Sequence, residues 1–346
     1  MTDRITLSYS ALRAFQNCPR AYLYRYLDCI EPTTDKPRAL RAGSAFHAAL
    51  EKHLVGDTAK AREALIAEFA KANLGDDRVL ENRAKTLAMF DAYVQRYPTD
   101  PFTVQRVEAE FAAPIVNPDT SAESRTFDMG GKVDGVVVYQ GEGWLLEHKT
   151  TSQIDLAYIE KLWTDFQIHA YAHFCGVAFG VHPVGVIYNI AQTCTLQKQV
   201  RESDADFAAR YAELCAKNKT GKSKATQHPG ETWDEYAARV IAWYAERSDP
   251  DTGAFQRVFH RFHPAKVAEV AGTVWDLTQA LLEAHRAQRY IRNPSQCYVY
   301  NRACDYEPLC RSCDDPLIRA NCYRDRPVLN EELSGNPSDT PDEPAF

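Results

Sequence analysis

Two carboxylates and a lysine occur together within one short segment of the chain. Residues 129–150 read MGGKVDGVVVYQGEGWLLEHKT, in which Asp134 is followed by Glu147 and Lys149. Such groups are costly to bury in a purely apolar core. They are useful together where a divalent cation lies between the carboxylates and the ammonium holds or activates a water molecule. These residue types therefore indicate a metal site at which water is activated.

A predicted hairpin positions these residues. Strands are expected at 131–139 and 144–150, because the linker QGEG between them has the composition of a tight reversal. Side chains alternate along a strand, so Glu147 and Lys149 should share one face of the sheet. His148 should point to the opposite face.

The surrounding periodicity predicts further elements on both sides of this hairpin. An amphipathic helix is expected over GSAFHAALEKHL, and two more helices without evident chemistry within 57–97. A strand is predicted at 104–115, a long helix at 154–179 and a buried strand at 184–191. Residues 192–290 are expected to be largely helical. Within them, FQRVFHRFHP fits either a nucleic-acid contact or a strand packed on the core.

Length and composition are those of a globular protein. The chain has 346 residues, 45% apolar residues and a formal charge of −7, so any nucleic-acid contact must come from a local basic surface. The longest apolar run is too interrupted for a membrane span, and the N-terminus lacks the layout of a signal peptide. A cytoplasmic protein is expected. The acidic, Pro- and Ser-rich tail at 327–346 is predicted to be disordered.

Half of the ten cysteines lie in the last fifty residues. In a reducing compartment, such crowding indicates metal or cluster ligation rather than disulfides. Cys297, Cys304, Cys310 and Cys313 occur at gaps of six, five and two residues. Four thiolates fit either a structural zinc ion or a 4Fe–4S cluster.

Taken in order, these motifs resemble the PD-(D/E)xK nuclease superfamily. The N-terminal LSYSALRAFQNCPRAYLYRYL, the G-x-x-x-H-x-x-L-E helix with His47, and Q-x-x-x-Y with Gln167 and Tyr171 resemble its RecB-like branch. That branch includes the RecB and AddB nuclease domains and the CRISPR-associated adaptation nucleases. The fold implied is α/β, with a restriction-endonuclease-like αβββαβ core, a mixed central sheet, helical insertions and a C-terminal cysteine cluster.

The resemblance also implies roles for individual residues. The metal ligands for Mg²⁺ or Mn²⁺ would be His47, Asp134, Glu147 and the backbone carbonyl of His148. Lys149 would position or deprotonate the attacking water, and Gln167 and Tyr171 would orient the DNA strand. An acidic residue of the first core strand can assist such a site. Glu108 and Glu110 share a face of the strand at 104–115, and Glu110 is the candidate, although a solvated edge position is the other interpretation.

The cysteines would hold a 4Fe–4S cluster, with structural Zn²⁺ as the alternative. The expected ligands are Cys18, Cys297, Cys304 and Cys310, with Cys313 as a spare. The RecB-like spacing C-x2-C-x5-C is matched only by its final pair, since Cys297 lies seven residues before Cys304. A cluster that includes Cys18 would join both ends of the chain.

The expected activity is metal-dependent hydrolysis of DNA. An exonuclease acting on single-stranded DNA or DNA ends is expected, in recombination, repair or replication, including phage-type systems. A separate helicase or recombination protein would be its partner. The alternative is a catalytically silent iron–sulfur DNA-binding or scaffold protein of the same fold. A single domain is expected at 1–326, with the core at about 40–191, a helical region at 192–290 and the cysteine region at 291–322.

Overall fold

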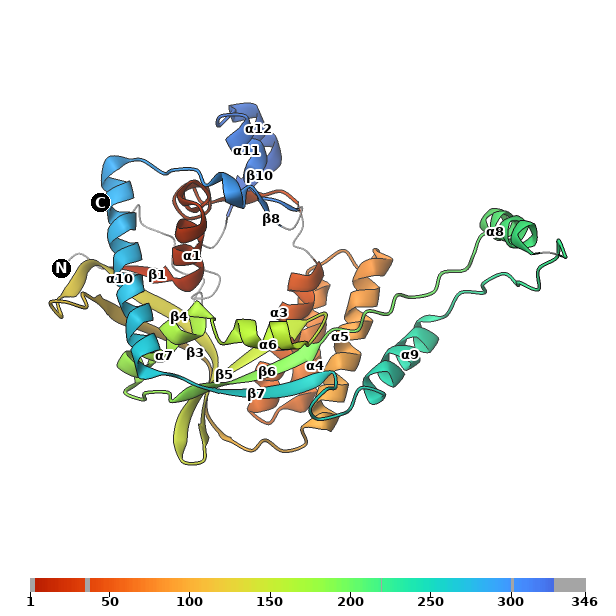
Figure 1. Cartoon of the computed structure of the whole chain (residues 1–346), viewed down its shortest axis with the longest axis horizontal. Helices are drawn as coiled ribbons and strands as arrows, with labels where there is room; N and C mark the ends of the chain where they lie inside the picture. Colours follow the sequence, from red (N-terminus) through yellow and green to blue (C-terminus); the bar gives the residue numbers. More distant parts are fainter. Residues whose placement is uncertain (1–3, 35–37, 219, 300–301, 327–346) are drawn as a thin grey trace.

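A mixed β-sheet forms the centre of the molecule (Figure 1). The computed structural model of the chain describes residues 4–34, 38–218, 220–299 and 302–326, so the tail predicted to be disordered lies outside the described residues. Within these ranges the central sheet has six strands in the order β1-β4-β5-β6-β7, with β3 also paired to β4. They are β1 (Ile5–Ser8), β3 (Thr103–Val116), β4 (Glu123–Tyr139), β5 (Glu142–Thr151), β6 (Gly185–Gln192) and β7 (Phe255–Arg261).

The sheet is mixed because β1–β4 and β5–β6 are parallel pairs and the other pairs are antiparallel. This confirms the α/β fold class. Two strands, β1 and β7, come from outside the range of 40–191 predicted for the core. The segment FQRVFHRFHP contains β7, so its interpretation as a strand is confirmed.

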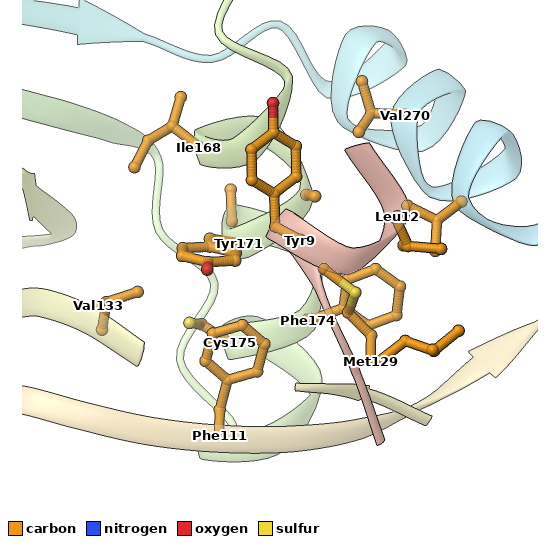
Figure 2. Packing of buried hydrophobic residues seen from close by; sticks show 14 of the residues in the cluster. Tyr9, Leu12, Phe111, Met129, Val133, Ile168, Tyr171, Phe174, Cys175 and Val270 are labelled. Carbon is orange, nitrogen blue, oxygen red and sulfur yellow. The ribbon is translucent and has the colours of Figure 1, made fainter. Parts of the chain in front are cut away.

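Helices cover both faces of the sheet (Figure 1). One hydrophobic cluster joins the sheet to α1 (Tyr9–Asn17), α7 (Phe166–Phe179) and α10 (Pro264–Ala287). Figure 2 shows part of it, with Phe111 of the sheet beside Tyr171 of α7, and Met129 of the sheet beside Phe174 of the same helix. The second cluster contains α3 (Arg38–Leu54), α4 (Thr58–Ala70), α5 (Asp77–Arg96) and α9 (Trp233–Ala245).

The long helix predicted at 154–179 is two helices, α6 (Leu156–Leu162) and α7. The side chain of Asp155 caps α6 and that of Asp165 caps α7, each by accepting a backbone N–H of its first turn. Aspartate is a strong N-cap residue because its carboxylate satisfies a donor that the helix itself leaves unpaired. The helical periodicity was therefore correct, but a new helix begins at the second aspartate.

The remaining helices, turns and strands complete the fold. They are α2 (Pro19–Tyr22), a π-helical turn (Leu23–Leu27), β2 (Ile30–Pro32), α8 (Asp204–Lys217), a 3-10 turn (Pro294–Gln296), β8 (Tyr298–Val299), β9 (Arg302–Ala303), α11 (Glu307–Arg311), α12 (Pro316–Cys322) and β10 (Tyr323–Asp325). β10 pairs with β2, which joins the C-terminal part of the described chain to its N-terminal part. Among the described residues, none of the helices combines the length and apolar character that crossing a membrane requires.

Gly185 at the start of β6 permits a close approach that a larger residue would prevent. A Cβ atom there would overlap the ring of Trp144 and lie 2.5 Å from the carbonyl oxygen of His260. We expect Gly185→Ala to destabilise the protein by about 1–3 kcal/mol, as overpacking does. Gly272→Ala in α10 is the matched control, because its Cβ would meet nothing nearer than 3.8 Å. It should stabilise by about 0.5–1 kcal/mol, and urea unfolding that shifts both variants in the same direction would contradict this prediction.

Candidate active site

The two carboxylates lie at a fork between β4 and β5. The strands remain paired until Gly135 meets Leu146, and Asp134 and Glu147 are the next residues on each. On the N-terminal side of Asp134, β4 pairs instead with β1, whose residues Ile5–Ser8 lie opposite Phe127–Gly130. The fork therefore opens the sheet at the position of the two carboxylates.

A side chain replaces the missing strand partner at this fork. The Asp134 carboxylate accepts the backbone N–H of His148 at 2.7 Å. A buried N–H needs such an acceptor, so this hydrogen bond both satisfies the strand end and fixes the direction of Asp134. The register that brings the two strands together is set by Gln140 and Gly141, whose φ angles of 51° and 81° fit a two-residue type I′ turn.

Strand β3 and helix α3 complete a group of possible metal ligands around Asp134. His47 of α3 places Nδ1 3.3 Å from Oδ1 of Asp134. Glu108 of β3 joins them, and one ligand atom from each of the three residues lies within 4.8 Å of the others. Glu108 has a φ of 48°, which is uncommon away from glycine and marks a local distortion of the strand.

Glu108, rather than Glu110, is therefore the acidic residue of the first core strand that reaches this group. Glu110 is exposed, as the alternative interpretation of that residue expected. The pairs that flank Glu108, Val107 with Gly135 and Ala109 with Val133, place it opposite Asp134. Strand alternation alone put both glutamates on one face and did not distinguish them.

Electrostatics in this group favour charge on both the imidazole and the aspartate. Burial opposes the charged form of His47, but the charge and hydrogen bond of Asp134, with smaller contributions from Glu147 and Glu108, raise its pKa to about 9. Burial also opposes the charged form of Asp134, yet His47 and the N–H of His148 hold its pKa well below the usual range. The result is a compact set of carboxylates around one positive charge.

Lys149 lies beside two carboxylates. Its Nζ is 2.7 Å from Oε1 of Glu147 and 3.6 Å from Oδ2 of Asp165. The prediction that Glu147 and Lys149 share a face is confirmed. Burial raises the pKa of Glu147 to about 7, with Lys149 acting in the opposite direction. Burial also disfavours the lysine ammonium, but Glu147 and Asp165 outweigh it and raise the pKa of Lys149.

His148 lies on the face of β5 opposite Glu147 and Lys149, as the strand alternation predicted, and its ring packs edge-on against His47, with centroids 5.8 Å apart. Its Nδ1 is 2.9 Å from Nδ2 of Asn189, which also donates to the Tyr93 hydroxyl at 2.7 Å. Burial lowers the pKa of His148 to about 3, so the imidazole is neutral and Nδ1 accepts from the amide. Arg257 donates to the Asn189 amide oxygen. This network holds β5 from the face opposite Glu147, while the role of the His148 carbonyl stays a prediction.

Gln167 and Tyr171 lie on α7 and both line the cavity described below. The Tyr171 ring is 1% exposed and packs edge-on against Phe111, with centroids 5.1 Å apart (Figure 2). Gly131 permits this packing, because a Cβ there would lie 2.7 Å from the Phe111 ring. The predicted pair is therefore brought to the site by one helix, and its role in orienting DNA stays a prediction.

A cavity of about 900 Å³ is lined by His47, Glu108, Asp134, Glu147, Gln167 and Tyr171, and it extends to α5. Its wall includes Arg78, Asn82 and Lys85 of that helix, for which the sequence indicated no chemistry. The rest is rich in hydroxyl groups, among them Thr150 and Ser152. Only the packing of α5 against α3 and α9 could have revealed this wall.

The predicted cluster ligands come together where the ends of the described chain meet. Asn293 links two of them, since its N–H donates to Sγ of Cys18 at 3.4 Å and its carbonyl lies 3.9 Å from Sγ of Cys297. The N–H of Cys304 donates to the carbonyl of Cys297 at 2.7 Å. Burial raises the pKa of Cys304 and of Cys310, and the charge on Cys18 adds to both shifts.

Comparison with known proteins gives one family. A family model described as the PD-(D/E)XK nuclease superfamily matches residues 6–311. This range includes the fork, α3, α7 and all four of the predicted cysteine ligands. None of the curated proteins matches the chain.

Proposed function

The chain belongs to the PD-(D/E)XK nuclease superfamily, and from that premise we propose that it hydrolyses phosphodiester bonds of DNA with the help of Mg²⁺ or Mn²⁺. One observation carries this proposal. The group formed by His47, Glu108 and Asp134 lines one cavity together with Glu147, at the same strand fork where Glu147 pairs with Lys149. Carboxylates that flank a lysine in this way are the groups that metal-assisted hydrolysis requires.

The side chains fit a hard divalent cation. Asp134, Glu108 and Glu147 offer oxygen atoms, which suit Mg²⁺ and Mn²⁺, and His47 adds a nitrogen that Mn²⁺ accepts readily. Burial disfavours the charged form of Glu108 and Glu147 and raises the pKa of both, so a cation bound beside them would favour their ionised form. When bound, the ion would lower the pKa of its water and stabilise charge on the scissile phosphate. The carbonyl of His148 would be a further ligand.

The remaining residues hold and orient the reactants. Lys149 holds the attacking water or neutralises charge that develops on the phosphate, as a preorganised cation does. Gln167 and Tyr171 orient the strand from α7. A hydroxyl-rich wall and α5 extend the cavity beyond the ligand group, which provides room for nucleotides next to the scissile one.

Arg78 is the cation of this wall that is available to a phosphate. Among the described residues, Lys85 pairs with Glu81 and Lys132 with Glu108, whereas Arg78 has no acidic partner. We expect Arg78→Ala to weaken DNA binding roughly tenfold and to reduce the slope of log Kd against log salt by about one. Binding would be measured in the inactive Glu147→Gln background.

Arg83→Ala provides the matched control for Arg78→Ala. Arg83 lies on the same helix and is not part of the cavity wall. Its replacement should leave both affinity and salt dependence unchanged. Equal losses in the two variants would instead indicate a general effect of charge on α5.

We also propose that Cys18, Cys297, Cys304 and Cys310 hold a 4Fe–4S cluster. The contacts of Asn293 with Cys18 and Cys297, and of Cys304 with Cys297, support a ligand set drawn from both ends of the described chain. Bound there, either inorganic centre would join the two ends of the chain, and structural Zn²⁺ is the alternative to the cluster.

Cys18→Ser tests that proposal. It should remove the iron and the acid-labile sulfide, and lower the free energy of unfolding by on the order of 3 kcal/mol, as for a crosslink that closes a long loop. Cys215→Ser on α8 is the control, since that helix buries none of its residues. Iron and sulfide retained by Cys18→Ser would remove Cys18 from the ligand set. Zinc bound in place of iron would exclude a 4Fe–4S cluster.

The finer parts of the proposed function rest on the RecB-like motifs. They are action as an exonuclease on single-stranded DNA or DNA ends, a separate helicase or recombination protein as partner, and a place in recombination, repair or replication. The test uses anaerobically purified protein and end-labelled single- and double-stranded DNA with Mg²⁺ or Mn²⁺. Cleavage that Glu147→Gln abolishes would support a metal nuclease, and the product ladder gives its polarity. Protein that binds DNA but does not cleave it with either ion would favour the scaffold alternative.

A further inference from the structure

The side chain of Lys149 has two carboxylate neighbours that differ in what else they do. Glu147 lies 2.7 Å from Nζ and belongs to the strand fork. Asp165 lies 3.6 Å from Nζ and stands at the start of α7, outside the group of His47, Glu108 and Asp134. The ammonium is therefore held between the fork and the helix.

Only one of these neighbours is free to serve the lysine alone. The proposed function assigns Glu147 to the metal ions, and a carboxylate that shares its charge with a cation attracts an ammonium less strongly. Asp165 is not assigned to the metal ions, so its attraction to the ammonium is undiminished when Glu147 is engaged.

Asp165 is itself firmly placed. Its Oδ1 accepts the N–H of Gln167 at 3.0 Å, and its carbonyl oxygen lies 2.7 Å from Nδ1 of His169. Both partners belong to the first turn of α7. The break between α6 and α7 is what brings Asp165 to this position, since in an uninterrupted helix it would be an interior residue without a cap to make.

We infer that Asp165 is a positioning residue for Lys149, and that it couples the lysine to the helix bearing Gln167 and Tyr171. This inference rests on the proposed nuclease activity. It assigns one carboxylate two contacts, a helix cap through Oδ1 and an ion pair through Oδ2. A movement of α7 on binding a strand would thereby move the ammonium as well.

The two contacts can be separated by substitution. Asparagine and serine cap helices about as well as aspartate, so Asp165→Asn and Asp165→Ser should retain α7 and lose only the ion pair. We expect kcat to fall on the order of 10- to 100-fold in both, as when a partner that orients an active-site group is removed. KM for DNA, the urea midpoint and the Mg²⁺ or Mn²⁺ concentration that half-saturates thermal stabilisation should stay unchanged.

Asp155→Asn is the matched control. Asp155 caps α6 in the same manner, with its side chain accepting the N–H of Tyr158, and it forms no ion pair with any residue that the structure describes. Its kcat should equal that of the wild type. A wild-type kcat in Asp165→Asn and Asp165→Ser would overturn the inference, and so would a lower urea midpoint that accounts for the loss. If the wild-type protein itself cleaves no DNA, the proposed function fails instead.

Discussion

Replacing Lys149 with alanine is expected to reduce cleavage on the order of 10²- to 10³-fold, the loss typical of one preorganised charged or hydrogen-bonding group that stabilises the transition state. Its Nζ lies 2.7 Å from Oε1 of Glu147, and its side chain is partly exposed. Lys149 is not one of the grouped ligands His47, Glu108 and Asp134. Metal binding should therefore survive the substitution while turnover does not.

The pH of this measurement matters because Glu147 loses its partner. Burial already raises the pKa of Glu147 to about 7, and Lys149 acts against that rise. Without the lysine the pKa of Glu147 rises further, so a proton competes with the metal for this carboxylate up to a higher pH. Metal binding by Lys149→Ala should thus be closest to that of the wild type at alkaline pH and fall further below it as the pH is lowered.

The control for this variant is Lys161→Ala, which removes an exposed lysine of α6. It should retain wild-type turnover. Single-turnover rates at saturating metal separate the chemical step from binding. A Lys149→Ala protein that cleaves at the wild-type rate would exclude the lysine from the reaction.

Asp134→Asn is expected to abolish both metal binding and cleavage. Saturating Mg²⁺ or Mn²⁺ at 100 times its Kd should stabilise the wild type by about 2.7 kcal/mol, and this stabilisation should vanish in the variant. Asparagine can still accept the N–H of His148, so the strand fork itself is retained. Cleavage should fall by at least on the order of 10³-fold, because the ion supplies most of the charge stabilisation.

The metal-free protein should also become less stable in this variant. The pKa of Asp134 is depressed in the folded state, so its contribution to stability is present at neutral pH and is lost as the pH falls through its titration. The difference in unfolding free energy with and without metal is therefore the quantity to compare between the variant and the wild type. Asp128→Asn on the same strand is the control, since Asp128 pairs with Arg4 away from the ligand group. Metal-dependent stabilisation retained by Asp134→Asn would remove that residue from the ligand set.

Local patterns in the sequence were sufficient to predict the hairpin and the groups that it carries. Alternation along β5 placed Glu147 and Lys149 on one face and His148 on the other, and the structure agrees. The four-residue spacing of Gln167 and Tyr171 correctly gave one helix face. These predictions succeeded because strand and helix periodicities are fixed by backbone geometry over a few residues.

Only the tertiary structure distinguished residues whose local patterns are equivalent. Glu108 and Glu110 alternate alike, and a φ of 48° with the placement of α3 decides that Glu108 reaches His47. Asp165 was hidden within an apparently continuous helix, and its contact with Lys149 joins two elements through space.

The same holds for α5 and for the strands β1 and β7, which join the site or the sheet across long stretches of chain. Sequence determines which chemical groups are present and their local direction. Which of them meet depends on packing between distant elements. The free energy of a contact depends on both partners, and the residue spacing around one partner does not identify the other.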